Sequence, residues 1–235
     1  MGKNLIQQRR GRGSPTYRAP SFRYEGRVKH PALETVGTVI DLVHSAGHYA
    51  PLMQLSLLTG ERGLALAPEG IRVGDEIAIG AGVPIKEGNV LPLKDIPEGT
   101  LIHNLELRPG DGGKLIRTSG GFGKVVAKSE TTVKVLLPSK KEKEFLLACR
   151  AAIGIVAGTG RPEKPFLKAG NRWKKMRARN KLYPHVCGIS MNAVDHPFGG
   201  KCSHIKGRPT QSPRSAPPGR KVGKIAPRRT GRKNR

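Results

Sequence analysis

Short apolar runs separated by turn residues recur through the middle of the chain. A first series occupies residues 38–46, 49–58, 63–67, 76–80 and 89–93, and a second occupies 101–107, 113–119, 124–129, 131–137, 143–149 and 153–158. Glycine, proline or acidic residues bound these runs, and within 131–137 Val133, Val135 and Leu137 alternate so that they share one face. Strands of this length and spacing are typical of small barrels or sandwiches. The pattern therefore predicts a mainly β fold with two small barrels, divided near residues 94–99.

The two ends of the chain carry no comparable strand pattern. Only residues 168–182 place Trp173, Met176 and Arg177 at helical spacing, and this segment is too polar to pack as a core helix. From Arg208 onward neither a helical nor a strand period is found. We therefore expect long irregular extensions at both ends. The predicted division is a basic N-terminal arm (1–34), a first RNA-binding barrel (35–95), a second barrel (96–165) and a basic C-terminal extension (166–235).

Charge separates the ends from the middle even more sharply. The formal net charge is +26, of which residues 1–34 contribute +6, residues 35–160 only +1 and residues 161–235 the remaining +19. Such a charge attracts polyanions, and nucleic acid is favoured over a membrane because no apolar run approaches 18 residues. Three widely spaced cysteines indicate a reducing cytoplasm rather than a disulfide framework.

The N-terminal arm interleaves arginine with Tyr17, Phe22 and Tyr24. Arginine pairs with phosphate through two parallel hydrogen bonds, and aromatic rings stack on unpaired bases, so this pattern favours RNA over an inert tail. A stretch with six glycines, 108–126, lacks the GKS or GKT ending of a nucleotide-hydrolysing loop. Its glycines are explained by tight turns, by close approach of the backbone to phosphates, or by both. The predicted RNA-binding cations are Arg9, Arg10, Arg12, Arg18, Arg23, Arg27, Lys29, Lys114, Arg117, Lys124, Arg172, Lys174, Lys175, Arg177, Arg179, Lys181, Lys201 and Arg208.

The segment 183–204 places an acidic residue, Asp195, in an otherwise basic region, directly before His196. A carboxylate beside an imidazole invites an acid–base interpretation, but no nucleophile is placed by the pattern, so we predict no catalytic residue. A tight loop that contacts RNA is the better interpretation, with Asn192, Asp195, His196, Gly199 and Gly200 as further contacts.

Metal binding was weighed for the same segment. Cys187, Cys202 and His204 are weak zinc candidates, with His185 and His196 nearby, but the paired spacing of most zinc sites is missing. We therefore predict no metal site and no cofactor, with Mg²⁺ present only through RNA.

Three elements together carry a resemblance. RRGRGSP near the start, IHNLELRPGDGGKLIRTSGG at 102–121 and CGISMNAVDHPFGG at 187–200 resemble the second universal protein of the large ribosomal subunit (the L-two family), in its archaeal or eukaryotic type. The resemblance implies an OB-like first barrel, an SH3-like second barrel and no enzymatic activity. It also implies that the extensions thread through large-subunit ribosomal RNA (rRNA) near the peptidyl-transferase region and support subunit association and tRNA binding.

The implied partners are large-subunit rRNA, other large-subunit proteins and the small subunit at the intersubunit face, in cytoplasmic ribosomes. The family's loop histidine and its acidic neighbour carry over to His196 and Asp195. Two positions depart from the bacterial pattern: Cys187 stands where an arginine is expected, and Phe198 replaces a second histidine. No histidine pair is therefore predicted.

Two other functional classes remain open. A free translation or transcription factor with an SH3-like RNA-binding module would bind reversibly and would not need two long basic arms. An enzyme acting on nucleic acid would need paired carboxylates for a metal, or a nucleophile with its base, and no such cluster stands out.

Overall fold

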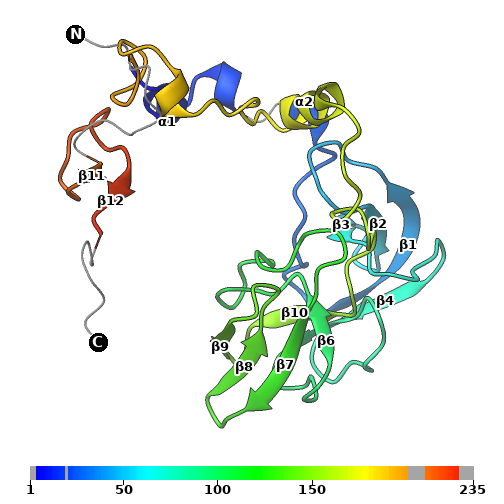
Figure 1. Ribbon diagram of the computed structural model, residues 1–235. Coiled ribbons are helices and arrows are strands. Elements are labelled where there is room, and N and C mark those ends of the chain that lie inside the picture. The colour runs from blue at the N-terminus through cyan, green and yellow to red at the C-terminus, as the bar shows by residue number, and fades with distance from the viewer. Residues whose placement is uncertain (1–3, 19–20, 201–209, 228–235) are drawn as a thin grey trace. The chain divides into compact units, whose positions relative to one another are not determined.

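The computed structural model describes residues 4–18, 21–200 and 210–227. The chain divides into two compact units (Figure 1). One consists of Met1–Ala19 together with Gly170–Arg235, and we call it the terminal unit; the other is Pro20–Ala169, and we call it the strand unit. Each unit is described by itself.

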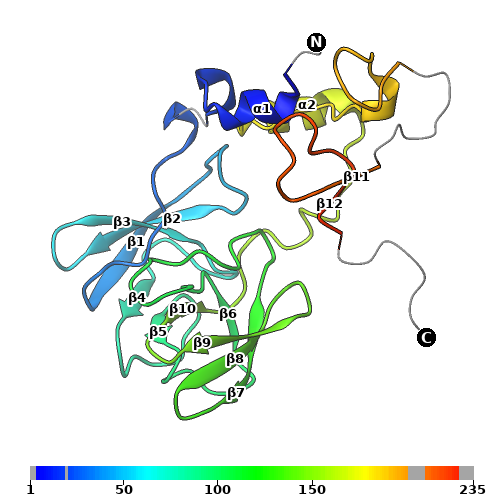
Figure 2. The same ribbon diagram turned by 90° about the vertical axis from the view of Figure 1, so that its left-hand side faces the viewer.

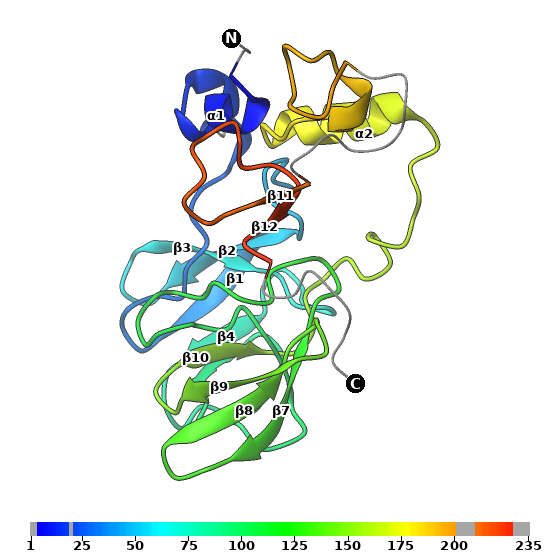
Figure 3. The ribbon, with the colours of Figure 1, turned by 60° about the vertical axis from the view of Figure 1, so that its left-hand side comes forward.

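The strand unit is built on one ten-stranded sheet in the order β3-β2-β1-β4-β5-β10-β6-β7-β8-β9. All neighbours pair antiparallel except β4 and β5. Figure 2 shows β1, β2 and β3 side by side, and Figure 3 shows β7, β8 and β9. The strands are β1 (Thr35–Val43), β2 (Leu52–Leu57), β3 (Arg62–Leu66), β4 (Glu76–Ile79), β5 (Val90–Pro92), β6 (Leu101–His103), β7 (Gly123–Lys128), β8 (Thr132–Leu136), β9 (Glu142–Leu146) and β10 (Arg150–Ile153).

The predominance of strands confirms the prediction of a mainly β fold. In β8 the alternation separates a buried face from an exposed one, as expected for a strand. Val133 and Val135 are fully buried, while Lys134 between them is exposed. The OB-like and SH3-like types of the two barrels stay a prediction, as does the four-part division of the chain.

Two expected strands differ from the structure. Residues 113–119 form no strand and contribute only an isolated bridge between Leu105 and Leu115, because Gly113 and Ile116 both have positive φ angles. The strand expected at 153–158 is β10, which lies earlier in the chain and stops before Gly154 at a φ of 103°. Positive φ at these positions interrupts the extended backbone that a ladder needs.

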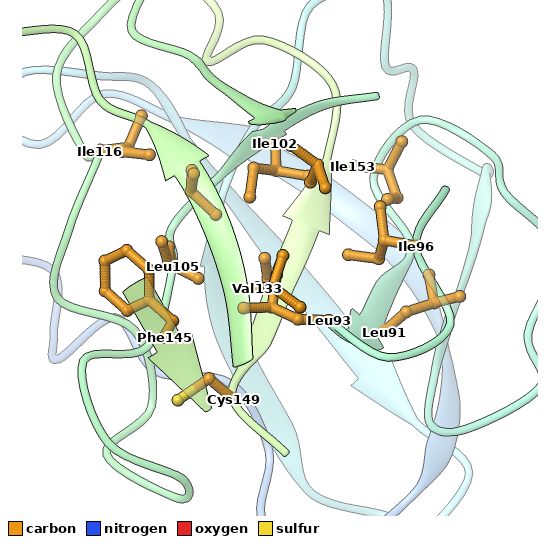
Figure 4. Packing of buried hydrophobic residues seen from close by; sticks show 13 residues of the cluster. Leu91, Leu93, Ile96, Ile102, Leu105, Ile116, Val133, Phe145, Cys149 and Ile153 are labelled. Carbon is orange, nitrogen blue, oxygen red and sulfur yellow. The ribbon is translucent and has the colours of Figure 1, made fainter. Parts of the chain in front are cut away.

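The core of the strand unit has two main clusters. Figure 4 shows the larger one, in which side chains from β5 to β10 and their connections meet around Val133. The other is formed mostly by β1 to β5. The larger cluster comprises Leu91, Leu93, Ile96, Ile102, Leu105, Ile116, Val125, Val133, Val135, Phe145, Cys149, Ala151 and Ile153, and the other comprises Val39, Met53, Leu55, Leu57, Ala65, Ala67, Ile77, Ile79, Val90 and Ala152.

The terminal unit holds short elements, including α1 (Ile6–Gly11), α2, whose range Ala169–Ala178 begins one residue before the unit, and the two-residue strands β11 (Gln211–Ser212) and β12 (Lys224–Ile225). The helix expected within 168–182 is α2, and it buries none of its side chains. The 3-10 helices are η1 (Pro15–Tyr17) and η3 (Gly188–Ser190) in this unit, and η2 (Ser21–Arg23) in the strand unit.

The C-terminal extension carries more local structure than its pattern predicts. Leu5, Phe198 and Val222 are buried in one small cluster, and β11 pairs in parallel with β12. The buried Ser212 hydroxyl donates to the carbonyl of Val222 at 2.7 Å. No single window of sequence shows this cluster, because its three members come from three distant segments.

Among the described residues, no helix has both the length and the apolar character that crossing a membrane requires.

Candidate nucleic-acid interface

A buried carboxylate organises the glycine-rich connection after β6. Glu106 is fully buried, and its carboxylate accepts hydrogen bonds from the backbone N–H groups of Gly112 at 3.1 Å and Arg150 at 3.0 Å. The Arg150 guanidinium lies 3.1 Å from the same carboxylate and also donates to the Pro31 carbonyl at 2.6 Å. These partners outweigh the effect of burial and hold the pKa of Glu106 below its ordinary value. The carboxylate is therefore charged and fully used in holding the backbone.

A second carboxylate shapes the turn itself. Asp111 accepts from the backbone N–H groups of Leu107 at 3.1 Å, Arg108 at 3.3 Å and Gly113 at 3.1 Å, and these bonds lower its pKa against the opposing effect of burial. Gly113 has a φ of 88°, and a Cβ there would lie 2.6 Å from the Asn104 carbonyl oxygen. Glycine is thus required at this position for both conformation and space.

The end of the N-terminal arm is attached to this turn. The backbone N–H of His30 donates to the Gly112 carbonyl at 3.0 Å, and His30 Nε2 lies 2.7 Å from the Asn104 carbonyl oxygen. The methylene chain of Lys29 lies across Gly112, and a Cβ on Gly112 would lie 3.0 Å from Lys29 Cγ. The turn therefore fixes where the arm's last cations lie.

Four predicted cations meet as a result. Arg27 and Lys29 from the arm and Lys114 and Arg117 from the glycine-rich stretch line one surface hollow of about 360 Å³, which we call the basic hollow. The guanidinium of Arg117 donates to the carbonyls of Gly113 at 3.3 Å and Val28 at 3.4 Å. Burial and the neighbouring charge of Arg27 lower the pKa of Arg117. Like charges gathered without an equal number of carboxylates form an anion-binding surface.

The loop 187–200 of the terminal unit folds on itself. The N–H groups of Asp195 and His196 both donate to the Asn192 carbonyl, at 3.0 and 3.1 Å, and that of Gly200 donates to the Met191 carbonyl at 3.1 Å. A Cβ on Gly199 would lie 2.3 Å from the Met191 carbonyl oxygen, so this position accepts only glycine.

The imidazole of His196 is held inside this loop. Its Nδ1 accepts the N–H of Phe198 at 3.1 Å, and its ring lies 5.2 Å from the Phe198 ring and packs directly on Gly188. Burial lowers the pKa of His196, which favours the neutral imidazole. Phe198 itself is buried in the small cluster with Leu5 and Val222, which gives the residue at the predicted second-histidine position a packing role.

A larger hollow of about 600 Å³ also lies in the terminal unit. Its lining includes Arg9 and Arg10 from α1 and Asn192, Asp195 and His196 from the loop. The structure thus brings five predicted contacts from both ends of the chain to one place.

The basic side chains of α2 form another group. Arg177 lies over the Trp173 ring at 5.0 Å, and Arg172 lies over the Tyr183 ring at 5.2 Å. Lys174 is exposed and Lys175 is half-buried, while Arg179, directly after the helix, is buried. This exposed, cation-rich helix presents both charge and an aromatic face.

The remaining predicted residues are scattered. Arg12, Arg18 and Lys181 are exposed in the terminal unit, Arg23 lies over the Phe22 ring, and Lys124 is an exposed residue of β7. Lys201, Arg208, Cys202 and His204 lie outside the described residues. Within the ranges that the structure describes, no group of three potential metal ligands comes together, and Cys187 is an exposed free thiol.

Sequence reasoning missed the groups that position the cations. Glu106 and His30 are buried and Arg150 is partly buried, and neither spacing nor composition distinguishes these three residues from their neighbours in the sequence. A carboxylate followed by three glycines within seven residues was the one available signal, since glycine turns expose N–H groups that such a carboxylate can accept.

Comparison with known proteins adds an independent finding. Residues 86–219 match the family model described as "Ribosomal Proteins L2, C-terminal domain". A "Large ribosomal subunit protein uL2" from Methanothermobacter thermautotrophicus is 48% identical over 240 residues, which cover 99% of this chain and all of that protein. Proteins of the same name from Halorubrum lacusprofundi and Haloarcula marismortui are 50% and 48% identical over 236 residues, covering 99% of this chain and 98% of each relative.

Proposed function

This chain belongs to the uL2 family of large ribosomal subunit proteins, as its motifs predicted, and from that premise we propose that it binds large-subunit rRNA through the basic hollow and its two basic extensions. Membership makes the chain a structural constituent of the large subunit and not an enzyme. The proposal adds what it binds and through which residues.

The observation that carries the proposal is the meeting of Arg27, Lys29, Lys114 and Arg117 in one hollow. Two of these cations come from the arm and two from the glycine-rich stretch, and buried hydrogen bonds fix both segments. A fixed backbone keeps the four positive charges close together, and the Arg117 guanidinium, already held by two carbonyls, loses little side-chain freedom when it binds phosphate. Neutralised phosphates release counterions, which supplies most of the affinity at low salt.

We extend the proposal to the loop 187–200. Its glycines let the loop fold tightly on itself, and a partly buried His196, whose lowered pKa favours the neutral imidazole, offers a hydrogen-bonding group that phosphate neutralisation alone does not require. We propose that this loop lies near the peptidyl-transferase region and supports subunit association and tRNA binding, and the family resemblance of its motif supports this. The proposed partners are large-subunit rRNA, other large-subunit proteins and the small subunit, in cytoplasmic ribosomes, with Mg²⁺ contributed through the RNA alone.

Fractionation tests the proposal against a free factor. We expect the tagged full-length chain to sediment with large subunits and to remain there after a high-salt wash, because a subunit constituent is held by many phosphate contacts. A chain that washes into the soluble fraction would instead be a reversible factor.

A substitution tests the loop separately. For His196→Ala we expect reduced association of the two subunits, or reduced translation, with unchanged binding of the chain to rRNA. The matched control is His185→Ala, an exposed histidine that lines the same larger hollow. Normal translation by ribosomes carrying His196→Ala would restrict this histidine to a structural role.

A further inference from the structure

The basic hollow has an aromatic wall as well as cations. Tyr24 and His48 both line it, with ring centroids 5.3 Å apart and ring planes at 80°. The Tyr24 ring lies against Gly47 so closely that a Cβ there would overlap it, and Ser45 Oγ lies 2.8 Å from His48 Nδ1. The loop after β1 therefore fixes the two rings in place.

The other wall of the basic hollow carries an excess of positive charge. Among the residues that the structure describes, Asp111 is the one carboxylate that lines this hollow, beside four cations. Its carboxylate accepts three backbone N–H groups and lies 3.6 Å from Lys114 Nζ. Arg27, Lys29 and Arg117 remain as positive groups facing the space, and Arg117 is held by backbone carbonyls rather than by a carboxylate.

The size of the hollow limits what it accepts. A volume of about 360 Å³ lies near the lower end of the range for small-ligand pockets, roughly 300–1,000 Å³. This is room for a single nucleotide and not for a base pair. In duplex RNA the bases are paired and stacked on one another, so their faces are not available to a protein aromatic ring. An unpaired base has a free face on which such a ring can stack.

We infer that the basic hollow binds one unpaired nucleotide of RNA, with its base against Tyr24 and His48 and its phosphate between Arg27 and Arg117. The inference rests on the proposed function and specifies it: rRNA contacts this place through a nucleotide in a bulge, loop or single strand. Stacking on Tyr24 tolerates any base, so the site selects unpaired conformation rather than sequence.

Binding of short model RNAs by the full-length chain tests the inference. The probes are a single-stranded oligouridine and a blunt RNA duplex of equal length, measured by fluorescence anisotropy at one fixed salt concentration. We expect Tyr24→Leu to weaken oligouridine binding about tenfold, the effect of losing one base–aromatic stack, and to leave duplex binding unchanged. Tyr24→Phe keeps the ring and should bind as the unsubstituted chain does.

Charge variants complete the test. Arg27→Gln should weaken oligouridine binding several-fold, whereas Lys141→Gln, an exposed lysine in the turn between β8 and β9, should leave it within twofold, since one phosphate contact is lost only in the first case. A 4-thiouridine-labelled probe should crosslink to the peptides that contain Tyr24 or His48.

These measurements distinguish failure of RNA binding as a whole from failure of the nucleotide site alone. If neither RNA binds the unsubstituted chain, the proposed function is wrong, and this inference with it. If both bind but Tyr24→Leu and Lys141→Gln behave alike, or if crosslinks fall only on other peptides, the nucleotide site is wrong while RNA binding stands. A third outcome would assign the basic hollow to an acidic protein segment. In that case an oligoaspartate peptide displaces the oligouridine but not the duplex, and Tyr24→Leu binds oligouridine as tightly as the unsubstituted chain.

Discussion

Two buried histidines make the strand unit sensitive to mild acid. His30 and His103 are almost wholly buried, at 5% and 1% exposure. Burial lowers the pKa of each from 6.5 to about 4, against hydrogen bonds to the carbonyls of Asn104 and Gly154 that would raise it. The perturbation is a change from pH 7.5 to pH 5, where the folded unit keeps both imidazoles neutral and the unfolded chain protonates them.

The difference in pKa between the folded and unfolded states fixes the sign and the size of the change in unfolding free energy. Because each pKa is lower in the folded state than in the unfolded chain, stability is fully present above pH 6.5 and is lost as the pH falls toward 4. At pH 5 the unfolded chain gains about 2 kcal/mol from each histidine, so the pair should reduce the free energy of unfolding by about 4 kcal/mol. Aspartate and glutamate side chains of the unfolded chain remain mostly ionised over this interval, so they add little.

Urea unfolding of the full-length chain, followed by circular dichroism in the strand region, measures this change. His30→Gln and His103→Asn keep an N–H donor near the original position but cannot be protonated. Each should be less stable at pH 7.5, yet should lose only about 2 kcal/mol on going to pH 5, half the unsubstituted loss. His185→Gln, an exposed histidine of the terminal unit, serves as the control and should keep the full loss.

The pH dependence, rather than the stability itself, decides the matter. If His30→Gln and His103→Asn lose as much stability as the unsubstituted chain between pH 7.5 and pH 5, the buried histidines are not the source of the acid sensitivity. His30 also ties the arm to the turn that carries Lys114 and Arg117. This contact should persist in the folded unit at pH 5, because the His30 imidazole stays neutral there.

Three further predictions concern the carboxylates, the glycine turn and the RNA. Glu106→Gln should destabilise the strand unit by about 2–3 kcal/mol, because it removes the charge partner of the partly buried Arg150 and weakens the hydrogen bonds that the buried carboxylate accepts, and equal urea midpoints would contradict this. Gly113→Ala should cost about 2 kcal/mol more than Gly110→Ala, since both have positive φ but only the first new Cβ would strike Asn104; thermal unfolding that ranks them equally would remove the steric argument. If about ten phosphates are contacted, the logarithm of the rRNA affinity should fall with the logarithm of salt with a slope of about −7 to −9, and a filter-binding slope near −2 would refute an electrostatic interface.

Local periodicity explains why most of the fold was predictable. Val133 and Val135 alternate with exposed residues, and this pattern depends only on which side of the sheet is buried. The segment 113–119 contains the apolar pair Leu115–Ile116 but forms no strand, because Gly113 and Ile116 take positive φ in a turn held by Glu106. The partner of that carboxylate, Arg150, lies far along the chain, so the local glycines alone could not show how the turn is held.

The site was predictable by residue type but not by arrangement. Tyr24, Arg27 and Lys114 stand in patterns typical of RNA binding, and the sequence alone identified those patterns. Their meeting in one hollow depends on His30 and on the turn after β6, which are non-local contacts. The cluster of Leu5, Phe198 and Val222 was missed for the same reason, since its members lie far apart in segments with few apolar residues.

The nearly neutral charge of residues 35–160 is a poor guide to what their surface attracts. Residues 35–160 contain 14 basic and 13 acidic side chains. However, Glu106 and Asp111 accept hydrogen bonds from backbone N–H groups, and each pairs with a single cation. Carboxylates used in this way stabilise a turn and do not neutralise the Arg27 and Arg117 charges beside it. The middle of the chain should therefore bind RNA in its own right, and a chain that keeps both extensions unchanged but carries Lys114→Gln and Arg117→Gln should bind measurably less tightly. If filter binding finds equal rRNA affinity for that double variant, the extensions alone hold the RNA, and the basic hollow makes no contribution.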